Sequence, residues 1–456
     1  MKPMIFIISI LLSVNVFAGP MTKLVTESQV DTYLKNGKFN GVVLVARDKK
    51  ILLKKAYGVR DLFSNQLLSA NDKFQIGSVS KQFVAVALLK LQEEGRLSLT
   101  DKVTKYLPEY VEFKNIEIKD LLNHTSGIAN YTDQVEFWKN VNYNRILSMD
   151  EILDFIRPYK LEFEVKSQWN YSNTNYIIAG KILEVVSQQS WDQFISQNFL
   201  IPMNMIDTGY VEFFESVSKV EGHMGNTSLK GEMNLSWASS AGGLYSTVDD
   251  LLKWTSIYDD SSLLTKKSKE QMQTPFLENY GLGITIGQLN NEVLINHSGR
   301  TPGFVTDLTY LKTSKLKVIT LDNMDGQNVN ASTVLLQYFS TGEALVVKNN
   351  PYFVPEEKLK DYVGTYEGKN LSLVITLDNN KLYLQPSGQR AYLLTPNDLD
   401  SFKLENVSGE EFIRNEDGLV VGLKHYQVGV SEFKKVSNKN KIRSVIQSKK
   451  QPFYIF

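Results

Sequence analysis

Residues 74–95, FQIGSVSKQFVAVALLKLQEEG, contain a long apolar segment that opens with a serine and a lysine three positions apart, Ser78 and Lys81. The segment lacks proline and ends at Gly95, a residue typical of helix ends, so it predicts a helix. A helix that is apolar on nearly all of its faces belongs inside a protein. Because residues i and i+3 share one helix face, the Ser78 hydroxyl and the Lys81 amine are expected within reach of each other.

The segments around this helix predict an α+β fold. Residues 41–58, GVVLVARDKKILLKKAYG, have the alternating pattern of a β-hairpin whose turn lies at RDKK. Helical patterns dominate the middle of the chain, and strand patterns return between about residues 280 and 323. We therefore expect strands from both ends of this region to form one sheet, which a helical region covers.

Changes in composition divide the chain of 456 residues into five segments. Residues 1–18 have a positive start, a short apolar stretch and small residues before the expected cleavage point, as in a secretory signal peptide. They predict an exported protein, periplasmic or secreted, without a membrane span in the mature chain; an uncleaved membrane anchor is the alternative. A main domain over 25–345, a linker at 346–354, a small all-β domain at 355–437 and a basic, polar tail at 438–456 would follow.

The composition excludes several classes of function. Lys plus Arg and Asp plus Glu both number 50, so no basic surface field favours nucleic acid as a partner. The absence of cysteine rules out a thiol nucleophile and a disulfide. The four histidines do not occur at the spacing of metal ligands. We therefore predict neither a metal site nor a cofactor.

The Ser-x-x-Lys spacing occurs four times, beginning at Ser78, Ser216, Ser314 and Ser431. Only Ser78 opens a long buried helix. There, burial would lower the pKa of Lys81 and make its amine a base, and the helix N-terminus would stabilise an oxyanion. The alternative is structural, with the serine as a helix N-cap and the lysine extending to the surface.

Two further motifs are ambiguous when each is considered alone. The triplet YSN at 171–173 contains the one Tyr-x-Asn in the chain. A phenol beside a cation can be held as phenolate and move a proton, and an Asn amide can bind a substrate carbonyl. The alternative is an aromatic-rich turn before a helix, with Asn173 as the helix cap. The triplet HSG at 297–299 lies on an expected strand, where its glycine would let a substrate approach the backbone. HMG at 223–225 has the same pattern in a loop-like stretch.

Taken in order, Ser-x-x-Lys, Tyr-x-Asn and His-x-Gly resemble the motifs of the penicillin-recognising serine hydrolases. The similarity is greatest to the branch of class C β-lactamases, D,D-carboxypeptidases, D-aminopeptidases and esterases. Supporting stretches are LLNHTSGI at 121–128, SAGGLYSTVDDLLKW at 240–254 and HSGRTPGF at 297–304. The resemblance covers about residues 25–345 and implies a β-lactamase/transpeptidase-like sheet of terminal strands with a helical region. The remainder resembles, more weakly, the small β-barrel domain that often follows such hydrolases.

The resemblance also implies a role for each motif residue. Ser78 would be the acylated nucleophile, Lys81 its activating base, and Tyr171 a group that exchanges protons with the serine and the leaving group. The backbone amides of Ser78 and Arg300 would form the oxyanion hole. The residues expected to bind substrate are Asn173, His297, Ser298, Gly299 and Arg300.

His297 departs from the family pattern, in which β-lactamases and many D,D-peptidases carry the lysine of a Lys-Thr-Gly triplet. A neutral histidine supplies no fixed charge for a substrate carboxylate; one hypothesis is that Arg300 supplies it. We therefore expect a serine hydrolase that acts on a small-molecule or peptide amide or ester, with peptidoglycan as a candidate partner, rather than an efficient β-lactamase. The alternatives are a non-catalytic penicillin-binding-like protein and a peptidoglycan-binding or scaffold protein.

Overall fold

The computed structural model describes residues 27–140, 145–224, 227–229, 234–325, 331–342, 354–368, 372–386, 391–404, 408–426 and 430–436. The expected signal peptide, the expected tail and residues 346–353 of the expected linker lie outside the described residues. The first described element is helix α1 (Glu27–Asn36), and the last is strand β20 (Val430–Val436).

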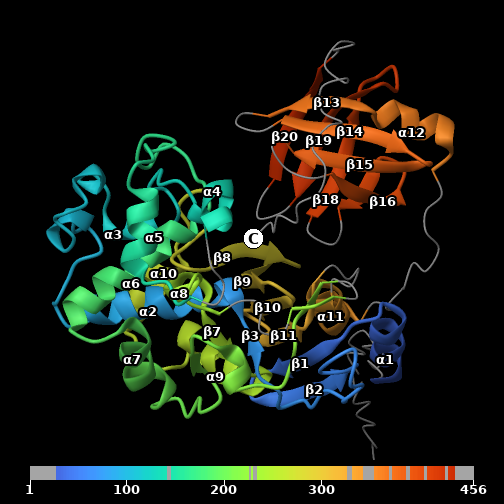
Figure 1. Ribbon diagram of the computed structural model, residues 1–456. Helices are drawn as coiled ribbons and strands as arrows, with labels where there is room; N and C mark the ends of the chain where they lie inside the picture. The colour runs from blue at the N-terminus through green and yellow to red at the C-terminus, as the bar shows by residue number, and fades with distance from the viewer. Residues whose placement is uncertain are drawn as a thin grey trace, which may run out of the picture.

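The main sheet has six antiparallel strands in the order β2-β1-β11-β10-β9-β8 (Figure 1). The hairpin expected at 41–58 forms, and the first strand after α1 pairs with the last strand of the sheet, so that Gly41 lies opposite Asp322. The expected α+β arrangement of terminal strands is therefore confirmed. The strands are β1 (Gly41–Arg47), β2 (Lys50–Tyr57), β8 (Thr285–Leu289), β9 (Glu292–Thr301), β10 (Phe304–Leu311) and β11 (Leu316–Asp322).

Both faces of this sheet are covered, as the interior strand β1 shows by being apolar at nearly every position. Val43 and Val45 face a core shared with α1 and α11 (Ala331–Thr341), whereas Val42 and Leu44 face the core of the helical region. Successive side chains of a strand point to opposite faces, so the run GVVLVA supplies both cores at once.

The helical region surrounds α2 (Ser80–Glu93), of which eleven residues are buried. A single turn of 3₁₀-helix, η1 (Gly77–Val79), precedes it, so the α-helix that was expected to open at Ser78 begins two residues later, at Ser80. The other α-helices described here are α3 (Ile118–Leu122), α4 (Val135–Asn140), α5 (Met149–Ile156), α6 (Asn173–Ser187), α7 (Trp191–Ile195), α8 (Ser239–Gly242), α9 (Val248–Trp254) and α10 (Lys266–Gln273).

Two small sheets connect this region to the main sheet. In one, β7 (Leu244–Ser246) lies between β3 (Phe74–Gln75) and β4 (Gly209–Tyr210). In the other, β5 (His223–Met224) lies between β12 (Met324–Asp325) and β6 (Thr227–Ser228). The first of these sheets holds the chain just before Ser78.

The C-terminal strands form a closed eight-stranded barrel with its own apolar core, preceded by helix α12 (Glu356–Tyr362) (Figure 1). This confirms the expected all-β, barrel-like domain. Its strands are β13 (Gly364–Glu367), β14 (Ser372–Asp378), β15 (Lys381–Pro386), β16 (Tyr392–Asp398), β17 (Ser401–Leu404), β18 (Ser408–Arg414), β19 (Val420–Tyr426) and β20.

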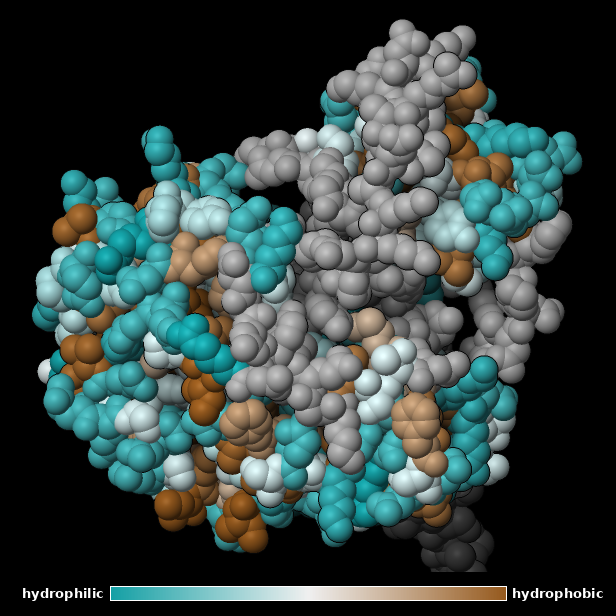
Figure 2. Space-filling view, viewed as in Figure 1, coloured by the Kyte–Doolittle hydropathy of each residue, from teal (hydrophilic) through white to brown (hydrophobic). Residues whose placement is uncertain are grey.

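On the face seen in Figure 2, the described residues are mainly hydrophilic, with apolar residues scattered among them. Apolar residues that are scattered in this way are ordinary on folded proteins and do not mark a docking surface. Among the described residues, no helix combines the length and the apolar character that crossing a membrane requires.

Candidate active site

The close contacts of the backbone before Ser78 require a glycine at position 77. Gly77 adopts a φ of +49°, and a Cβ there would lie 2.5 Å from the amide nitrogen of Arg300. Just before it, the Ile76 amide donates a 3.0 Å hydrogen bond to the carbonyl of Leu244 in β7. The chain thus turns sharply from β3 into η1, and Ser78 sits half-buried at the start of the helical segment.

Lys81 lies one turn further on and has no solvent-exposed surface. Its Nζ is 3.0 Å from Ser78 Oγ, 2.7 Å from Asn173 Oδ1 and 2.6 Å from the carbonyl oxygen of Ala241 in α8. Burial lowers the pKa of Lys81 well below its usual range. Among the described residues, no carboxylate forms an ion pair with this amine that would oppose the effect.

The three neighbours of the amine define where its lone pair points. The two carbonyl-type oxygens, on Asn173 and Ala241, can only accept hydrogen bonds. A neutral Lys81 amine has two N–H groups for them, which leaves its lone pair directed at the hydroxyl of Ser78. The site is therefore arranged for proton transfer from Ser78 to Lys81.

Asn173 is fixed by a second set of hydrogen bonds. Its Nδ2 donates to Thr132 Oγ1 at 3.0 Å, and its backbone amide donates to Asn130 Oδ1 at 2.9 Å. These contacts direct Oδ1 toward Lys81. The N-cap position of α6 belongs to Ser172, so Asn173 does not act as the helix cap that the sequence allowed as an alternative.

Tyr171 packs its ring beside the lysine amine. Lys81 Nζ is 4.8 Å from the centre of the Tyr171 ring, and the ring of His124 lies 4.2 Å away on centroids. The phenolic oxygen is buried and has no hydrogen-bond partner among the described residues. Burial raises the pKa of Tyr171, and the nearby Ser78 hydroxyl only partly opposes this. Tyr171 is therefore a neutral phenol in this state, rather than the phenolate that a neighbouring cation would favour, because Lys81 is itself driven toward neutrality.

His297 is neutral and both of its ring nitrogens are engaged. Nδ1 lies 2.6 Å from the carbonyl oxygen of Ser298, and Nε2 lies 2.7 Å from the hydroxyl of Tyr280. A carbonyl can only accept, so Nδ1 carries the proton and Nε2 accepts from the phenol. Burial, with a smaller contribution from Lys81, lowers the pKa of His297 to about 3. His297 thus braces Tyr280 and carries no charge at neutral pH.

Strand β9 runs directly against the turn that carries Ser78. A Cβ on Gly299 would lie 2.0 Å from the carbonyl oxygen of Ile76 and 2.9 Å from the amide nitrogen of Ser78. No side chain fits there, so the backbone of β9 and the turn that carries Ser78 form one surface. Ser298, one residue earlier, is exposed.

The amide of Arg300 faces the same surface. Thr301 and Phe304 flank the two-residue loop of the β9–β10 hairpin and pair with each other. Pairs alternate along an antiparallel ladder, so the N–H of Arg300 points away from β10, toward Gly77. Its guanidinium lies 3.6 Å from the carboxylate of Asp325. The side chain is thus committed to an ion pair rather than held as an unpaired charge for substrate.

Two of the other Ser-x-x-Lys copies, those at Ser216 and Ser314, show no comparable pairing among the described residues. Ser216 lies exposed in a 3₁₀ turn, where its hydroxyl donates to the carbonyl of Phe213. Lys317, the partner of Ser314 by spacing, donates instead to the carbonyl of Asp48. Ser431 lies on β20 of the barrel.

Several residues of the site carry no signal in the sequence that singles them out. They include Ala241, Thr132, Asn130 and Tyr280. The stretch SAGG suggests only a scaffold role, because a backbone carbonyl leaves no signature in side-chain identity. His124 supports the site rather than reacting in it. Its Nδ1 lies 3.1 Å from the amide of Ser172, which positions the segment that carries the Tyr-x-Asn motif.

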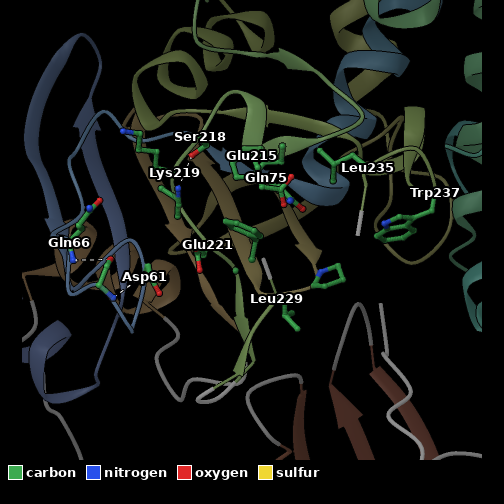
Figure 3. A pocket seen from close by; sticks show the side chains of 16 residues that line it. Asp61, Gln66, Gln75, Glu215, Ser218, Lys219, Glu221, Leu229, Leu235 and Trp237 are labelled. Carbon is green, nitrogen blue, oxygen red and sulfur yellow. Dashed lines mark hydrogen bonds between the residues drawn. The ribbon is translucent and has the colours of Figure 1, made fainter. Parts of the chain in front are cut away.

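A pocket of about 370 Å³ is lined in part by segments that adjoin this site in the chain (Figure 3). Gln75, three residues before Ser78, and Pro302 of the β9–β10 hairpin contribute to its walls. Figure 3 shows Trp237 at one end and Asp61 at the other. The segments that carry Ser78 and Arg300 therefore also contribute to the walls of this pocket.

Comparisons with known proteins agree with this fold. Penicillin-binding protein 4* of Bacillus subtilis is 28% identical over 426 residues, which cover 85% of this chain and 93% of that protein. The octameric penicillin-binding protein homologue from Pyrococcus abyssi has the same fold, with a TM-score of 0.62 and 24% identity over 90% of this chain and 99% of that one. A D-stereospecific amidohydrolase from a Streptomyces species has a TM-score of 0.60 and 22% identity over 70% of this chain and 100% of its own.

The β-lactamase/transpeptidase-like fold that the resemblance implied is thereby confirmed. The Beta-lactamase family model matches residues 26–337, well over half of the chain. The chain therefore belongs to the beta-lactamase family of penicillin-recognising serine hydrolases.

Proposed function

We propose that this protein is an exported serine hydrolase that cleaves an amide or ester through an acyl-enzyme on Ser78. The observation that carries the proposal is the buried Lys81 amine, 3.0 Å from Ser78 Oγ, whose other two partners can only accept hydrogen bonds. A neutral amine in this position can accept the proton of the Ser78 hydroxyl as a general base. The export part rests on the signal-peptide pattern of residues 1–18.

The reaction takes place in two halves. Ser78 Oγ attacks the substrate carbonyl carbon while its proton passes to Lys81 Nζ, and the amides of Ser78 and Arg300 donate to the oxyanion. When the tetrahedral intermediate collapses, the bond to the leaving group breaks, and the leaving amine or alcohol takes a proton from the neutral phenol of Tyr171, which Lys81 then reprotonates. Water attacks the acyl-enzyme along the same proton path in reverse and releases the acid and free Ser78.

The charges around the site favour substrates that do not depend on a carboxylate at the β9 strand. His297 is neutral, and the guanidinium of Arg300 faces Asp325. A β-lactam carboxylate would therefore lack the fixed positive charge that the Lys-Thr-Gly triplet supplies in other members of the family. We infer a peptidase, amidase or esterase, in keeping with the D-stereospecific amidohydrolase among the structural neighbours. Stem peptides of peptidoglycan are a candidate substrate, given the similarity to a penicillin-binding protein.

A panel of chromogenic substrates tests the proposal. The wild type should hydrolyse a p-nitrophenyl ester and at least one of the D- or L-amino-acid p-nitroanilides, and should do so more efficiently than it hydrolyses a chromogenic cephalosporin. Ser78→Ala should abolish turnover, whereas Ser216→Ala, which alters the exposed coincidental motif, should leave it unchanged.

Two outcomes would contradict the proposal. Turnover that survives in Ser78→Ala would place the nucleophile elsewhere. A folded wild type that hydrolyses none of these substrates and forms no covalent adduct would favour the non-catalytic alternative, in which the chain only binds penicillin-like or peptidoglycan ligands.

A further inference from the structure

One end of the pocket described above carries two acidic side chains close to a histidine. Asp61 and Glu221 line this end, with Glu221 between Asp61 and the middle of the pocket in Figure 3. His223, the first residue of β5, lies close to both carboxylates but does not line the pocket. Each of the three residues offers one ligand atom, and these atoms all lie within 4.8 Å of one another. None of the three takes part in the hydrolytic site described above.

The imidazole of His223 is buried with its hydrogen-bonding capacity unsatisfied, as expected of a side chain that binds a ligand. The residue is fully buried, with 0% of its surface exposed, and among the described residues neither ring nitrogen makes a well-formed hydrogen bond, although the backbone carbonyl of Arg60 lies near the ring. Buried polar groups without partners are rare, and a neutral imidazole leaves both a donor and an acceptor unsatisfied here. His297, by comparison, has a partner for each ring nitrogen.

The backbone that carries the three side chains is fixed by a buried asparagine. The amide group of Asn323 donates to the carbonyl oxygens of Arg60 and Glu221, at 3.2 and 2.9 Å, and accepts from Asn40 Nδ2 at 2.6 Å. The backbone amide of His223 donates to the carbonyl of Asn323 at 2.9 Å. Segments that are distant in the sequence are thus held together before any ligand binds.

The two carboxylates are oriented by their own hydrogen bonds. Both oxygens of Asp61 accept from backbone amides, those of Phe63 and Ser64, each at 2.9 Å. The hydroxyl of Ser228 donates to Glu221 Oε2 at 2.9 Å. Hydrogen bonds of this kind fix metal-binding carboxylates in known sites, and each carboxylate oxygen keeps a second lone pair for a ligand.

We propose that Asp61, Glu221 and His223 bind a divalent transition-metal ion, with Zn²⁺ as the expected occupant. One imidazole and two carboxylates form a donor set that suits first-row transition ions, whereas Ca²⁺ and Mg²⁺ prefer oxygen ligands alone. Zn²⁺ binds such ligands at about 2.0–2.2 Å, so side-chain rotations that draw the three atoms together complete the site. The pocket leaves a fourth position open to water or a ligand.

A metal ion at this site would also stabilise the position of the Arg300 backbone amide, which is proposed to bind the oxyanion. A Cβ on Gly303 would lie 2.5 Å from the backbone nitrogen of His223, and one on Gly222 would lie 2.9 Å from the carbonyl oxygen of Pro302. The tip of the β9–β10 hairpin therefore packs directly on the metal-binding segment. Arg300 belongs to the same hairpin, so the ion stabilises the strand whose amide faces the nucleophile.

The test measures metal directly and does not depend on activity. The full chain, without a polyhistidine tag, is stripped with a chelator, loaded with Zn²⁺, passed through gel filtration and analysed for metal content, with calorimetry giving the affinity. We expect one retained Zn²⁺ per chain, a higher melting temperature with metal, and visible d–d absorption when Co²⁺ replaces Zn²⁺.

Matched variants locate the site. Glu221→Gln and His223→Gln keep side-chain size and should weaken Zn²⁺ binding by more than about tenfold, since even outer-sphere changes reach that range. Glu215→Gln, at the same pocket, and His425→Gln, on β19 of the barrel, should bind as the wild type does. Retention of less than one ion per chain, or binding that the first pair of variants leaves unchanged, would overturn the proposal. The proposal would also be overturned if the metal-free chain bound methylammonium and retained no Zn²⁺. The pocket end with Asp61 and Glu221 would then be assigned to an organic cation.

Discussion

Replacing Lys81 by methionine separates the role of its amine in catalysis from its role in folding. Methionine keeps an unbranched side chain in the buried space, so packing changes little. General-base catalysis contributes roughly 10²- to 10⁴-fold, which corresponds to about 2.7–5.5 kcal/mol of activation free energy. We expect the rate of serine phosphonylation by a fluorophosphonate, followed by intact mass over time, to fall by that factor.

In Lys81→Met, the free energy of unfolding should change less than the activation free energy of phosphonylation. The substitution leaves Asn173 Oδ1 and the Ala241 carbonyl without their donor, at about 1–3 kcal/mol each. Against this, the folded state no longer contains the desolvated amine whose pKa is lowered by burial. These effects oppose each other, so urea unfolding should show a net change of about 2 kcal/mol or less.

Lys219→Met is the matched control, because Lys219 belongs to the coincidental motif and lies outside the hydrolytic site. It should change neither the phosphonylation rate nor the free energy of unfolding. The reasoning is refuted if Lys81→Met folds with the wild-type urea midpoint and still reacts within tenfold of the wild-type rate. Ser78 would then be activated by some other group.

Three further predictions follow from the same contacts. Gly299→Ala places a Cβ 2.0 Å from the carbonyl oxygen of Ile76, so both acylation rate and melting temperature should fall, whereas Gly287→Ala on β8, whose Cβ meets nothing closer than 3.6 Å, should be tolerated. Asn173→Asp puts a carboxylate beside the Lys81 amine, where the amide oxygen now lies 2.7 Å away, and should raise the pKa of that amine. The acid limb of the pH–rate profile should therefore move up by about 1–3 pH units, which pH-resolved kinetics would detect. His297 has a folded pKa of about 3 against an ordinary value of 6.5, so between these values the unfolded state binds more protons and stability falls as the pH is lowered; His297→Gln should flatten this part of a urea-unfolding profile by a few kcal/mol at most.

Much of the fold could be predicted because its sequence patterns are local. The run GVVLVA alternates between two cores, and the apolar helix after Ser78 has no polar face to expose, so both assignments need only the residues themselves. One sheet made of strands from both ends of the domain was expected, and in the structure β1 joins these ends by pairing with β11. The helix boundary was less accurate, because the sharp turn at Gly77 creates a 3₁₀ segment that helix periodicity does not reveal.

The sequence predicted that the motif side chains lie close together, but not the contacts that support them. Ser78, Lys81 and Asn173 come together as the motif order implied. The protonation state of Tyr171 could not be predicted, since it depends on burial and on Lys81 losing its charge, and neither is written in local sequence. The cluster that contains His223 was missed for a similar reason: Asp61 lies far away in the chain, and the buried network of Asn323 brings the two segments together.

The measurement that tests the central claim most directly is the intact mass of the protein after incubation with a fluorophosphonate and, separately, with a penicillin. Wild type, Ser78→Ala and Ser216→Ala are compared. We predict one phosphonate adduct on the wild type and on Ser216→Ala, and none on Ser78→Ala. A penicillin adduct should form slowly or not at all, given the neutral His297. A phosphonate adduct that persists in Ser78→Ala, or the absence of any adduct on the folded wild type, would contradict the assignment of Ser78 as the nucleophile.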